Sequence, residues 1–325
     1  MADIQLNKTV FFLIIGLGNI GKRHLESLLR VKNSFIYLKD VNEKNITNIL
    51  IQYSKKKIKK ISNLNEIKTK IDLAIIATNS DQRPKALSEL IKYSKIKNII
   101  LEKIIFQKLQ YFKKFLNISK KKKINIFVNH PRRFWKIFQK IKNEIEYNKS
   151  NFEIAFKSKD WGICCNSIHF IDLLFFLSFE KINVVHHYNF LQKKIYTSKR
   201  KGFYELKGKI NFECNNNNKL VLIDDNKLKK NIFTIKFANI VYNFETNENN
   251  FTIQKIKNSI TISKEKFIYK IPKQSELTQK YFYCLIHKKL NFLTSLEESY
   301  VHHKIFFNSI KENFRLKDKN LFPIT

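Results

Sequence analysis

The sequence predicts an α/β protein of two domains, a doubly wound parallel sheet followed by an α+β domain. Strand-like apolar runs alternate with helical segments as far as about residue 129, which is typical of a parallel sheet. Three glycines lie between the first apolar run and the first helical segment. Beyond residue 130, many segments alternate polar and apolar residues, as antiparallel strands with one buried face do.

The first domain is predicted over residues 1–129. Val10–Ile15 is a continuous apolar run, which a strand buried on both faces requires. Helices are expected at 19–30, 83–94 and 107–119, and Pro84 suits the first turn of the second of these. The other strands are expected at 34–38, 71–78, 97–102 and 123–129.

The second domain is predicted over residues 130–325. Helices at 134–147 and 166–179 precede short strands, of which 204–214 and 219–224 are the clearest and which continue to about residue 271. Two helices, 275–289 and 296–314, come last, and Ser295 with Glu298 forms a capping box for the second. We therefore expect a mostly antiparallel sheet with helices on one face.

The charge of the chain is strongly positive, because 62 Lys and Arg outnumber 27 Asp and Glu to give +35. Such a field attracts polyanions. The excess is almost all lysine and is spread along the chain, with runs at 55–60 and 120–123 that we expect to be solvated faces or turns. The abundant residues Lys, Asn, Ile and Phe share A/T-rich codons, so we interpret the lysine excess as a record of genome composition. Since the usual nucleic-acid-binding motifs are also missing, no specific nucleic acid is expected as a partner.

The cysteines and the apolar stretches indicate the compartment of the protein. Cys164, Cys165, Cys214 and Cys284 form no CxxC pair and no metal-ligand spacing, so we expect no metal, no disulfide and a reducing compartment. Cys164 and Cys165 are expected to be small buried residues. No signal-peptide pattern is present, and the apolar stretch 168–179 is too short to span a bilayer. We expect a cytoplasmic protein without membrane attachment.

Half of the six glycines lie at Gly16, Gly18 and Gly21, between the first strand and the first helix. Gly16 permits a tight turn, Gly18 lets backbone amides approach a pyrophosphate, and Gly21 lets the helix pack close to the sheet. Asn19 and Ile20 complete this loop, whose amides we expect to face the phosphates of a dinucleotide. The alternative is a flexible turn before a helix.

Asp40 ends the second strand, about 19 residues beyond Gly21. A carboxylate there accepts a hydrogen bond from a ribose 2′-hydroxyl and repels a 2′-phosphate. NAD is therefore the favoured cofactor, although Lys39 and Lys44 lie close by and leave NADP open.

Two further segments carry candidate catalytic residues. Lys103 follows a strand's carboxyl end, where a doubly wound sheet presents residues to a ligand; the alternative is a plain surface lysine. Asn166, His169 and Asp172 share one side of an apolar predicted helix. Since buried polar groups need partners, these three indicate either an internal network or a pocket wall. His169 titrates near neutral pH and suits a general acid or base.

These segments together resemble the Gfo/Idh/MocA family of sugar and cyclitol oxidoreductases. The resemblance covers nearly the whole chain, through "GLGNIGKRHLESL", "DLAIIATNSDQRPKALSELI", "LEK", "VNHPRRFW", "NSIHFIDL" and "SLEESYVHHKIFFNSI". It implies a Rossmann domain and a second domain with a large, open, mostly antiparallel sheet. It also implies hydride transfer between NAD(P) and a sugar, sugar derivative or nucleotide sugar, in a homodimer or homotetramer.

The resemblance assigns roles to residues of this chain. Lys103 matches the motif lysine that contacts cofactor and substrate, with Glu102 beside it at the cofactor. His169 matches the catalytic histidine, and Asp172 matches an aspartate that meets substrate hydroxyls, with Asn166 expected nearby. Two residues match the cofactor loop after the fourth strand, namely Thr78 and Asn79.

Three residues depart from the family pattern. Ile104 replaces the motif proline, Arg83 replaces a frequent histidine, and Cys165 stands where the family often has an aspartate. Catalysis would then rest on His169 and Lys103 alone. The alternative is an NAD-binding regulatory protein that has kept the fold.

Arg132 and Arg133 are expected to bind substrate, because arginine pairs bidentately with the carboxylate or phosphate of an acidic or nucleotide-linked sugar. The alternative is that they are surface charges or hold the domains together. Trp161 begins "WGICCNSIHFIDLL" and is also expected near the substrate. That segment and the ending "FPIT" resemble a branch associated with bacterial surface-glycan and acidic-sugar synthesis.

Overall fold

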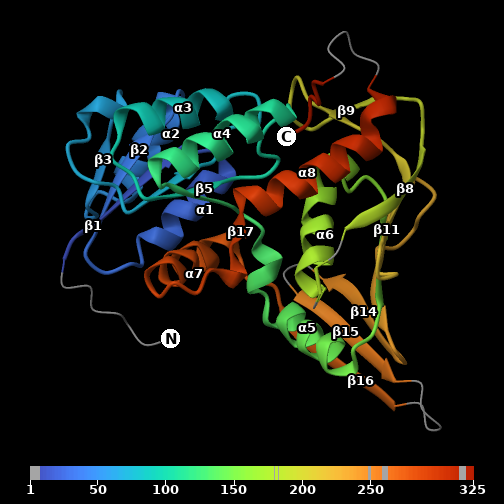
Figure 1. The fold of residues 1–325 in the computed structure, drawn as a ribbon. Helices are drawn as coiled ribbons and strands as arrows, with labels where there is room; N and C mark the ends of the chain where they lie inside the picture. The colour runs from blue at the N-terminus through green and yellow to red at the C-terminus, as the bar shows by residue number, and fades with distance from the viewer. Residues whose placement is uncertain (1–7, 179, 182, 248–249, 258–262, 315–319) are drawn as a thin grey trace. The chain divides into compact units, whose positions relative to one another are not determined.

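A computed structural model describes residues 8–178, 180–181, 183–247, 250–257, 263–314 and 320–325 (Figure 1). The chain divides into two compact units. The N-terminal unit comprises Met1–Pro131, Lys273–Ser299 and Thr325, and the C-terminal unit comprises Arg132–Pro272 and Tyr300–Ile324. The segment Lys273–Ser299 thus counts with the N-terminal unit, whereas the sequence placed all residues after 129 in the second domain.

The sheet of the N-terminal unit has the strand order β17-β6-β5-β4-β1-β2-β3. Neighbouring strands are parallel, except that β17 runs antiparallel to β6. The strands are β1 (Val10–Ile15), β2 (Ser34–Lys39), β3 (Ile58–Lys60), β4 (Leu73–Ile76), β5 (Asn98–Leu101), β6 (Asn125–Val128) and β17 (Thr294–Ser295). The chain builds outward from β1 to β3 and then from β4 to β6 in the other direction. The predicted doubly wound sheet is confirmed, with its switch point between β1 and β4.

Helices cover both faces of this sheet. In Figure 1, α3 and α4 lie on the opposite side of the sheet from α1 and α7, and α1 packs on α7. The helices are α1 (Asn19–Leu28), α2 (Glu43–Gln52), α3 (Arg83–Tyr93), α4 (Leu109–Lys122) and α7 (Gln274–Ile286), with short 3-10 turns at Leu64–Glu66 and Leu290–Phe292.

Some elements of this unit were predicted from local sequence patterns and others were not. The capping box is confirmed, because Glu298 N donates to Ser295 Oγ at 3.1 Å and Ser295 N donates to Glu298 Oε2 at 2.8 Å. The sequence identified neither α2 nor β3. The strand β3 falls within the lysine run 55–60, which was expected to be a solvated face or turn. It is a three-residue edge strand without a buried residue, so it has no hydrophobic pattern to detect.

The sheet of the C-terminal unit has the order β16-β15-β14-β13-β7-β12-β11-β8. Only β7 and β12 pair in parallel among its described strands, so the predicted mostly antiparallel sheet is confirmed. The strands are β7 (Phe152–Ser158), β8 (Val184–Leu191), β11 (Gly208–Cys214), β12 (Lys219–Asp224), β13 (Ile232–Phe237), β14 (Ile240–Asn247), β15 (Asn250–Lys257) and β16 (Ser263–Lys270); β9 (Tyr196–Thr197) and β10 (Tyr204–Glu205) form a separate pair. Buried residues alternate with partly or fully exposed ones along β12, β13 and β15, so one face of the sheet is buried and the other is less covered.

Two helices of this unit, α5 (Lys136–Asn148) and α6 (Ile163–Leu177), pack on each other, and α6 also packs on β12. Helix α8 (Leu296–Ile310) counts with this unit from Tyr300 onward. Helix α6 begins three residues before its predicted start, because Gly162 at its N-cap adopts a φ of 77°. Its predicted last residue, Phe179, lies outside the described residues.

A buried polar network joins α1 to the strand ends of the N-terminal unit. His24 in α1 is fully buried, with Nε2 2.8 Å from Glu102 Oε1 and Nδ1 2.8 Å from Thr278 Oγ1 of α7. Asn129, which follows β6, donates to the same Glu102 oxygen, and the Tyr281 hydroxyl donates to Asn129 Oδ1 at 2.7 Å. Since Glu102 follows β5, the network holds the end of that strand against α1 and α7.

The network also sets the charge of Glu102. Burial by itself raises the pKa of a carboxyl, but the hydrogen bond and charge of His24, together with the Asn129 amide, lower the pKa of Glu102 below its ordinary value of 4.5. The folded protein therefore favours the carboxylate. Its contribution to stability is present above pH 4.5 and is lost as the pH falls through the folded-state pKa.

Glu102→Gln removes this charge with little change of shape. Near neutral pH we expect the free energy of unfolding to fall by about 1–3 kcal/mol, the cost of disrupting a buried hydrogen bond so that a polar group loses its partner, as measured by urea denaturation. The difference from wild type should shrink below pH 4.5. Glu43→Gln, which removes an exposed pair with Lys60, is the control and should change stability little. Equal losses in the two variants would contradict the role of the network.

Candidate functional site

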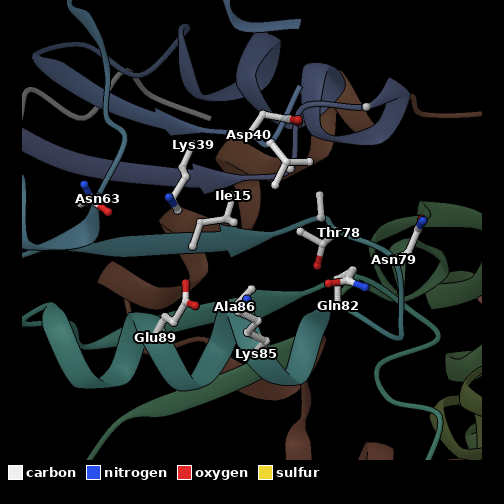
Figure 2. A pocket seen from close by; sticks show the side chains of 14 residues that line it. Ile15, Lys39, Asp40, Asn63, Thr78, Asn79, Gln82, Lys85, Ala86 and Glu89 are labelled. Atoms are coloured by element: carbon white, nitrogen blue, oxygen red, sulfur yellow. The ribbon is translucent and has the colours of Figure 1, made fainter. Parts of the chain in front are cut away.

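A cavity of about 580 Å³ lies where the strand order of the N-terminal sheet reverses. This is the place at which doubly wound sheets bind ligands, and the volume is typical of a ligand pocket. Figure 2 shows the end of β2 on one side and α3 on the other. The cavity is lined by Ile15, Gly16, Gly18, Lys39, Asp40, Val41, Asn63, Ala77, Thr78, Asn79, Gln82, Lys85, Ala86 and Glu89.

The three clustered glycines differ in their surroundings. A Cβ on Gly16, whose φ is 91°, would lie 2.8 Å from backbone atoms of Ala77 and Thr78. A Cβ on Gly21 would lie 2.0 Å from the Gly16 carbonyl oxygen. A Cβ on Gly18 would meet no atom within 4 Å, although Gly18 lines the cavity. Gly16 and Gly21 therefore allow close backbone packing, whereas Gly18 keeps space open in the cavity.

The N-terminus of α1 adjoins this open space. Gly18 is its N-cap, no side chain of the described residues caps it, and its first turn holds no acidic residue. Asn19, Ile20 and Gly21 form the start of the helix, where backbone N–H groups lack partners within the helix. Such a terminus suits an anionic group such as a pyrophosphate.

Asp40 follows β2 and is held by two backbone amides. Asn42 N donates to Oδ1 at 2.7 Å, and Leu17 N donates to Oδ2. A carboxylate has about four acceptor positions, so Asp40 can still accept hydrogen bonds from ligand hydroxyls. Its neighbour Lys39 donates from Nζ to the Ser62 carbonyl.

The opposite wall of the cavity comes from the loop after β4 and from α3. Thr78 Oγ1 is buried and has no hydrogen-bond partner among the described residues. Such a hydroxyl needs a partner, and a ligand in the cavity would supply one. Gln82, the N-cap residue of α3, and Lys85 and Glu89 within the helix line the same wall (Figure 2). The sequence did not single these three out, because polar residues on a helix face are typical of any surface.

The segment after β5 is almost entirely buried. From Leu101 to Phe106 every residue is buried except Lys103, which is partly exposed. Glu102 was expected beside the cofactor, but it is 6% exposed, contacts His24 and does not line the cavity. Lys103 does not line the cavity either.

In the C-terminal unit, two acidic residues hold the start of α6. The Glu205 carboxylate accepts from Cys164 N at 2.7 Å and from Cys165 N at 3.2 Å, and Asp224 accepts from Gly162 N at 3.2 Å. Burial, with Glu205 nearby, raises the pKa of the Cys164 thiol, so Cys164 is a neutral buried residue as expected. Cys165 is only partly buried. The sequence did not identify either acidic residue, because both lie far from α6 in the chain.

The polar residues of α6 have different surroundings. Asn166 Nδ2 donates to the Trp161 carbonyl at 2.6 Å, and Trp161 Nε1 donates to the Ile223 carbonyl at 2.9 Å. His169 is partly exposed, whereas Asp172 is fully buried. The contacts of Asn166 and Trp161 give both residues a part in shaping the start of the helix.

Asp172 forms a buried ion pair with Arg133. Arg133 Nε lies 3.1 Å from both carboxylate oxygens and Nη2 lies 2.8 Å from Oδ1. His302 Nδ1 is 3.6 Å from Oδ1. The two charges thus compensate each other within the unit, which indicates a structural contribution from both. Their contact with substrate stays a prediction.

Arg132 differs from its neighbour. Its guanidinium lies 4.2 Å from the centre of the Phe170 ring and 5.9 Å from that of Trp135. Nε and Nη1 are buried and have no hydrogen-bond partner within the described part of the chain. Burial lowers the pKa of Arg132 to about 10, and the charge of Asp172 opposes this shift. Arg132 is therefore a cation at neutral pH with donors that suit an anionic group.

Two kinds of feature are absent from the residues that the structure describes. No three or more His, Cys, Asp or Glu side chains gather in a way that would hold a metal ion. No described helix has both the length and the apolar character that crossing a membrane requires.

Comparison with known proteins identifies the N-terminal part. Residues 10–130 match the GFO_IDH_MocA family model, described as "Oxidoreductase family, NAD-binding Rossmann fold". The resemblance predicted from the sequence is thereby confirmed for residues 10–130. A comparison with curated protein sequences found no match.

Solved structures share the fold over both units. A super-repressor mutant of Gal80p from Saccharomyces cerevisiae has a TM-score of 0.73 and 13% identity, covering 94% of this chain and 96% of its own. UDP-N-acetylglucosamine 3-dehydrogenase from Acidithiobacillus ferrooxidans has a TM-score of 0.68 and 10% identity, and the match covers 93% of this chain and 97% of that one. An Agrobacterium radiobacter oxidoreductase in complex with NAD+, L-tartaric acid and magnesium has a TM-score of 0.70 and 12% identity, and the match covers 95% of this chain and 97% of that one.

Two glycine variants test the cavity as a dinucleotide site. Gly18→Ala adds a methyl group to open space, so we expect a melting temperature within about 2 °C of wild type and NAD binding weakened roughly tenfold or more in calorimetry. Gly21→Ala forces the backbone apart and should lower the melting temperature as well. Wild-type NAD affinity in Gly18→Ala would show that the cofactor does not use this cavity.

Proposed function

We propose that this protein transfers a hydride between NAD and a hydroxyl or keto carbon of an acidic sugar or nucleotide sugar. The match of residues 10–130 to the Gfo/Idh/MocA oxidoreductase family model supports this proposal. The observation that carries the proposal is the cavity at the switch point, where an open glycine position, an uncapped helix N-terminus and an unpartnered threonine hydroxyl meet. Each of these features suits a dinucleotide.

The preference for NAD over NADP rests on Asp40. Its carboxylate is held in place by two amides at the wall of the cavity. There it would accept bonds from ribose hydroxyls and repel a 2′-phosphate. Lys39, which kept NADP open in the sequence, donates to the Ser62 carbonyl, and this contact competes with any phosphate for its ammonium.

The catalytic roles are assigned to Lys103 and His169. When bound, the dinucleotide accepts the hydride from the carbinol carbon or returns it. His169 would take the hydroxyl proton as a general base and give it back in the reverse direction. Lys103 would donate a hydrogen bond to the reacting oxygen and stabilise its developing negative charge. Asn166 and Asp172 are proposed to hold neighbouring hydroxyls.

Arg132 supports an anionic substrate. Two of its nitrogens are buried without a partner in the described residues, and unpaired buried donors are costly unless a ligand satisfies them. A carboxylate or phosphate would satisfy them, which fits an acidic or nucleotide-linked sugar in surface-glycan synthesis.

We further propose that the protein is a homo-oligomer of the cytoplasm.

A second candidate is an NAD-binding regulatory protein. Cys165 stands where the family often has an aspartate, and the Asp172 carboxylate is paired with Arg133. The likeness to a Gal80p repressor shows that the fold also occurs in a regulator. Nicotinamide absorbance measured against a panel of sugars and nucleotide sugars separates the two candidates, because only the enzyme changes it.

Asp40→Asn tests the choice of cofactor. Without the negative charge, a 2′-phosphate is no longer repelled, so the ratio of NADP to NAD affinity should rise by about tenfold or more. Fluorescence titration with NADH and NADPH measures this ratio. Lys44→Ala, at an exposed residue of α2, is the control and should leave the ratio unchanged. A fall of the ratio in Lys44→Ala, with no rise in Asp40→Asn, would favour NADP as the natural cofactor.

Lys103→Ala and His169→Ala test the catalytic roles. Each should lower kcat by about 10²–10⁴-fold, the usual contribution of a proton-transfer group, while NAD affinity stays within about threefold of wild type. Lys113→Ala and His186→Ala, at exposed residues, are the matched controls. If Lys103→Ala and His169→Ala turn over substrate as fast as their controls, the assignment is wrong.

A further inference from the structure

Arg83, the first residue of α3, is only 2% exposed. Arginine is almost never this buried unless its donors are paired. The sequence marked it only as a departure from the family pattern. It belongs to neither the cofactor nor the substrate set described above, and it does not line the cavity.

The guanidinium of Arg83 joins two loops of the N-terminal unit. Nη1 donates to the Ile104 carbonyl and to the Ile105 carbonyl, the second at 3.0 Å. Nη2 donates to the Thr78 carbonyl. One side chain therefore ties the segment after β5 to the first loop residues after β4.

Buried hydrogen bonds hold the chain on both sides of Lys103. On its N-terminal side, the Glu102 carboxylate contacts His24 and Asn129. On its C-terminal side, Arg83 holds the next two carbonyls. The backbone on both sides of Lys103 is thus fixed by buried polar contacts, whereas Lys103 itself is partly exposed.

We propose that Arg83 is a positioning residue for Lys103. It sets the distance between the loop that carries Lys103 and the loop that carries the cavity-lining Thr78. This inference rests on the proposed function of Lys103 and adds to it a residue that needs no contact with substrate or cofactor.

The role depends on the shape of the guanidinium. Arginine presents five N–H donors in a planar fork, so one side chain reaches three carbonyls on two loops. Lysine keeps the charge but has a single nitrogen. Histidine, which is frequent here in the family that the sequence resembles, has at most two N–H donors. Neither replacement reproduces the bridge.

Arg83→Lys, alone and combined with Lys103→Ala, tests this inference. We expect Arg83→Lys to lower kcat about 10–100-fold through misplacement of Lys103, with NAD affinity within about threefold of wild type. In the Lys103→Ala background the same change should lower kcat by less than about twofold, because the group that it positions is gone. Arg83→His replaces it if Arg83→Lys does not fold, with the same expected pattern.

Leu87→Ala is the matched control, because Leu87 lies on the same helix and is fully buried. It should lower the melting temperature, and any effect on kcat should multiply independently with that of Lys103→Ala. Independent multiplication for Arg83→Lys as well, or a wild-type kcat in Arg83→Lys, would overturn the inference while the proposed function stands.

Hydrogen–deuterium exchange gives a readout that needs no activity. In Arg83→Lys, amides of residues 101–106 should exchange about tenfold faster or more, and Leu87→Ala should not accelerate this segment selectively. Unchanged exchange there overturns the inference. If wild-type protein turns over no substrate on the panel, the proposed function fails, and the exchange result still decides whether Arg83 holds the segment.

Discussion

The contact on which the N-terminal unit most depends is the buried one between His24 and Glu102. His24 belongs to α1, whose N-terminus adjoins the cavity, and Glu102 directly precedes Lys103. The contact is deep in the unit, so losing either partner takes one hydrogen bond from a buried polar group that water cannot reach. The interaction that stabilises this unit therefore also fixes the start of Lys103's segment relative to α1.

Several buried polar groups in each of the two units are committed to structure in the same way. Arg83 holds backbone carbonyls, Arg133 holds Asp172, and Glu205 holds the start of α6. Thr78 Oγ1 and two nitrogens of Arg132 are buried without a partner among the described residues. Groups of this second kind distinguish places for a ligand from places that maintain the fold.

Features that depend on neighbouring residues could be predicted from the sequence. The parallel sheet, the glycine turn and the antiparallel sheet each follow from a local pattern. The partners of Glu102 and Arg83 could not, because helical spacing and motif position say nothing about groups 78 or 21 residues away in the chain. Asp172 illustrates the limit: its spacing from His169 gave its side of the helix, but its pairing with Arg133 depends on tertiary packing.

A crystal structure with NAD and a substrate analogue is the most direct test of these assignments. We expect the pyrophosphate at the N-terminus of α1, the adenosine ribose at Asp40, and both Lys103 and His169 beside the nicotinamide and the reacting carbon. A dinucleotide bound elsewhere, or a nicotinamide ring that neither of these two side chains approaches, would contradict it.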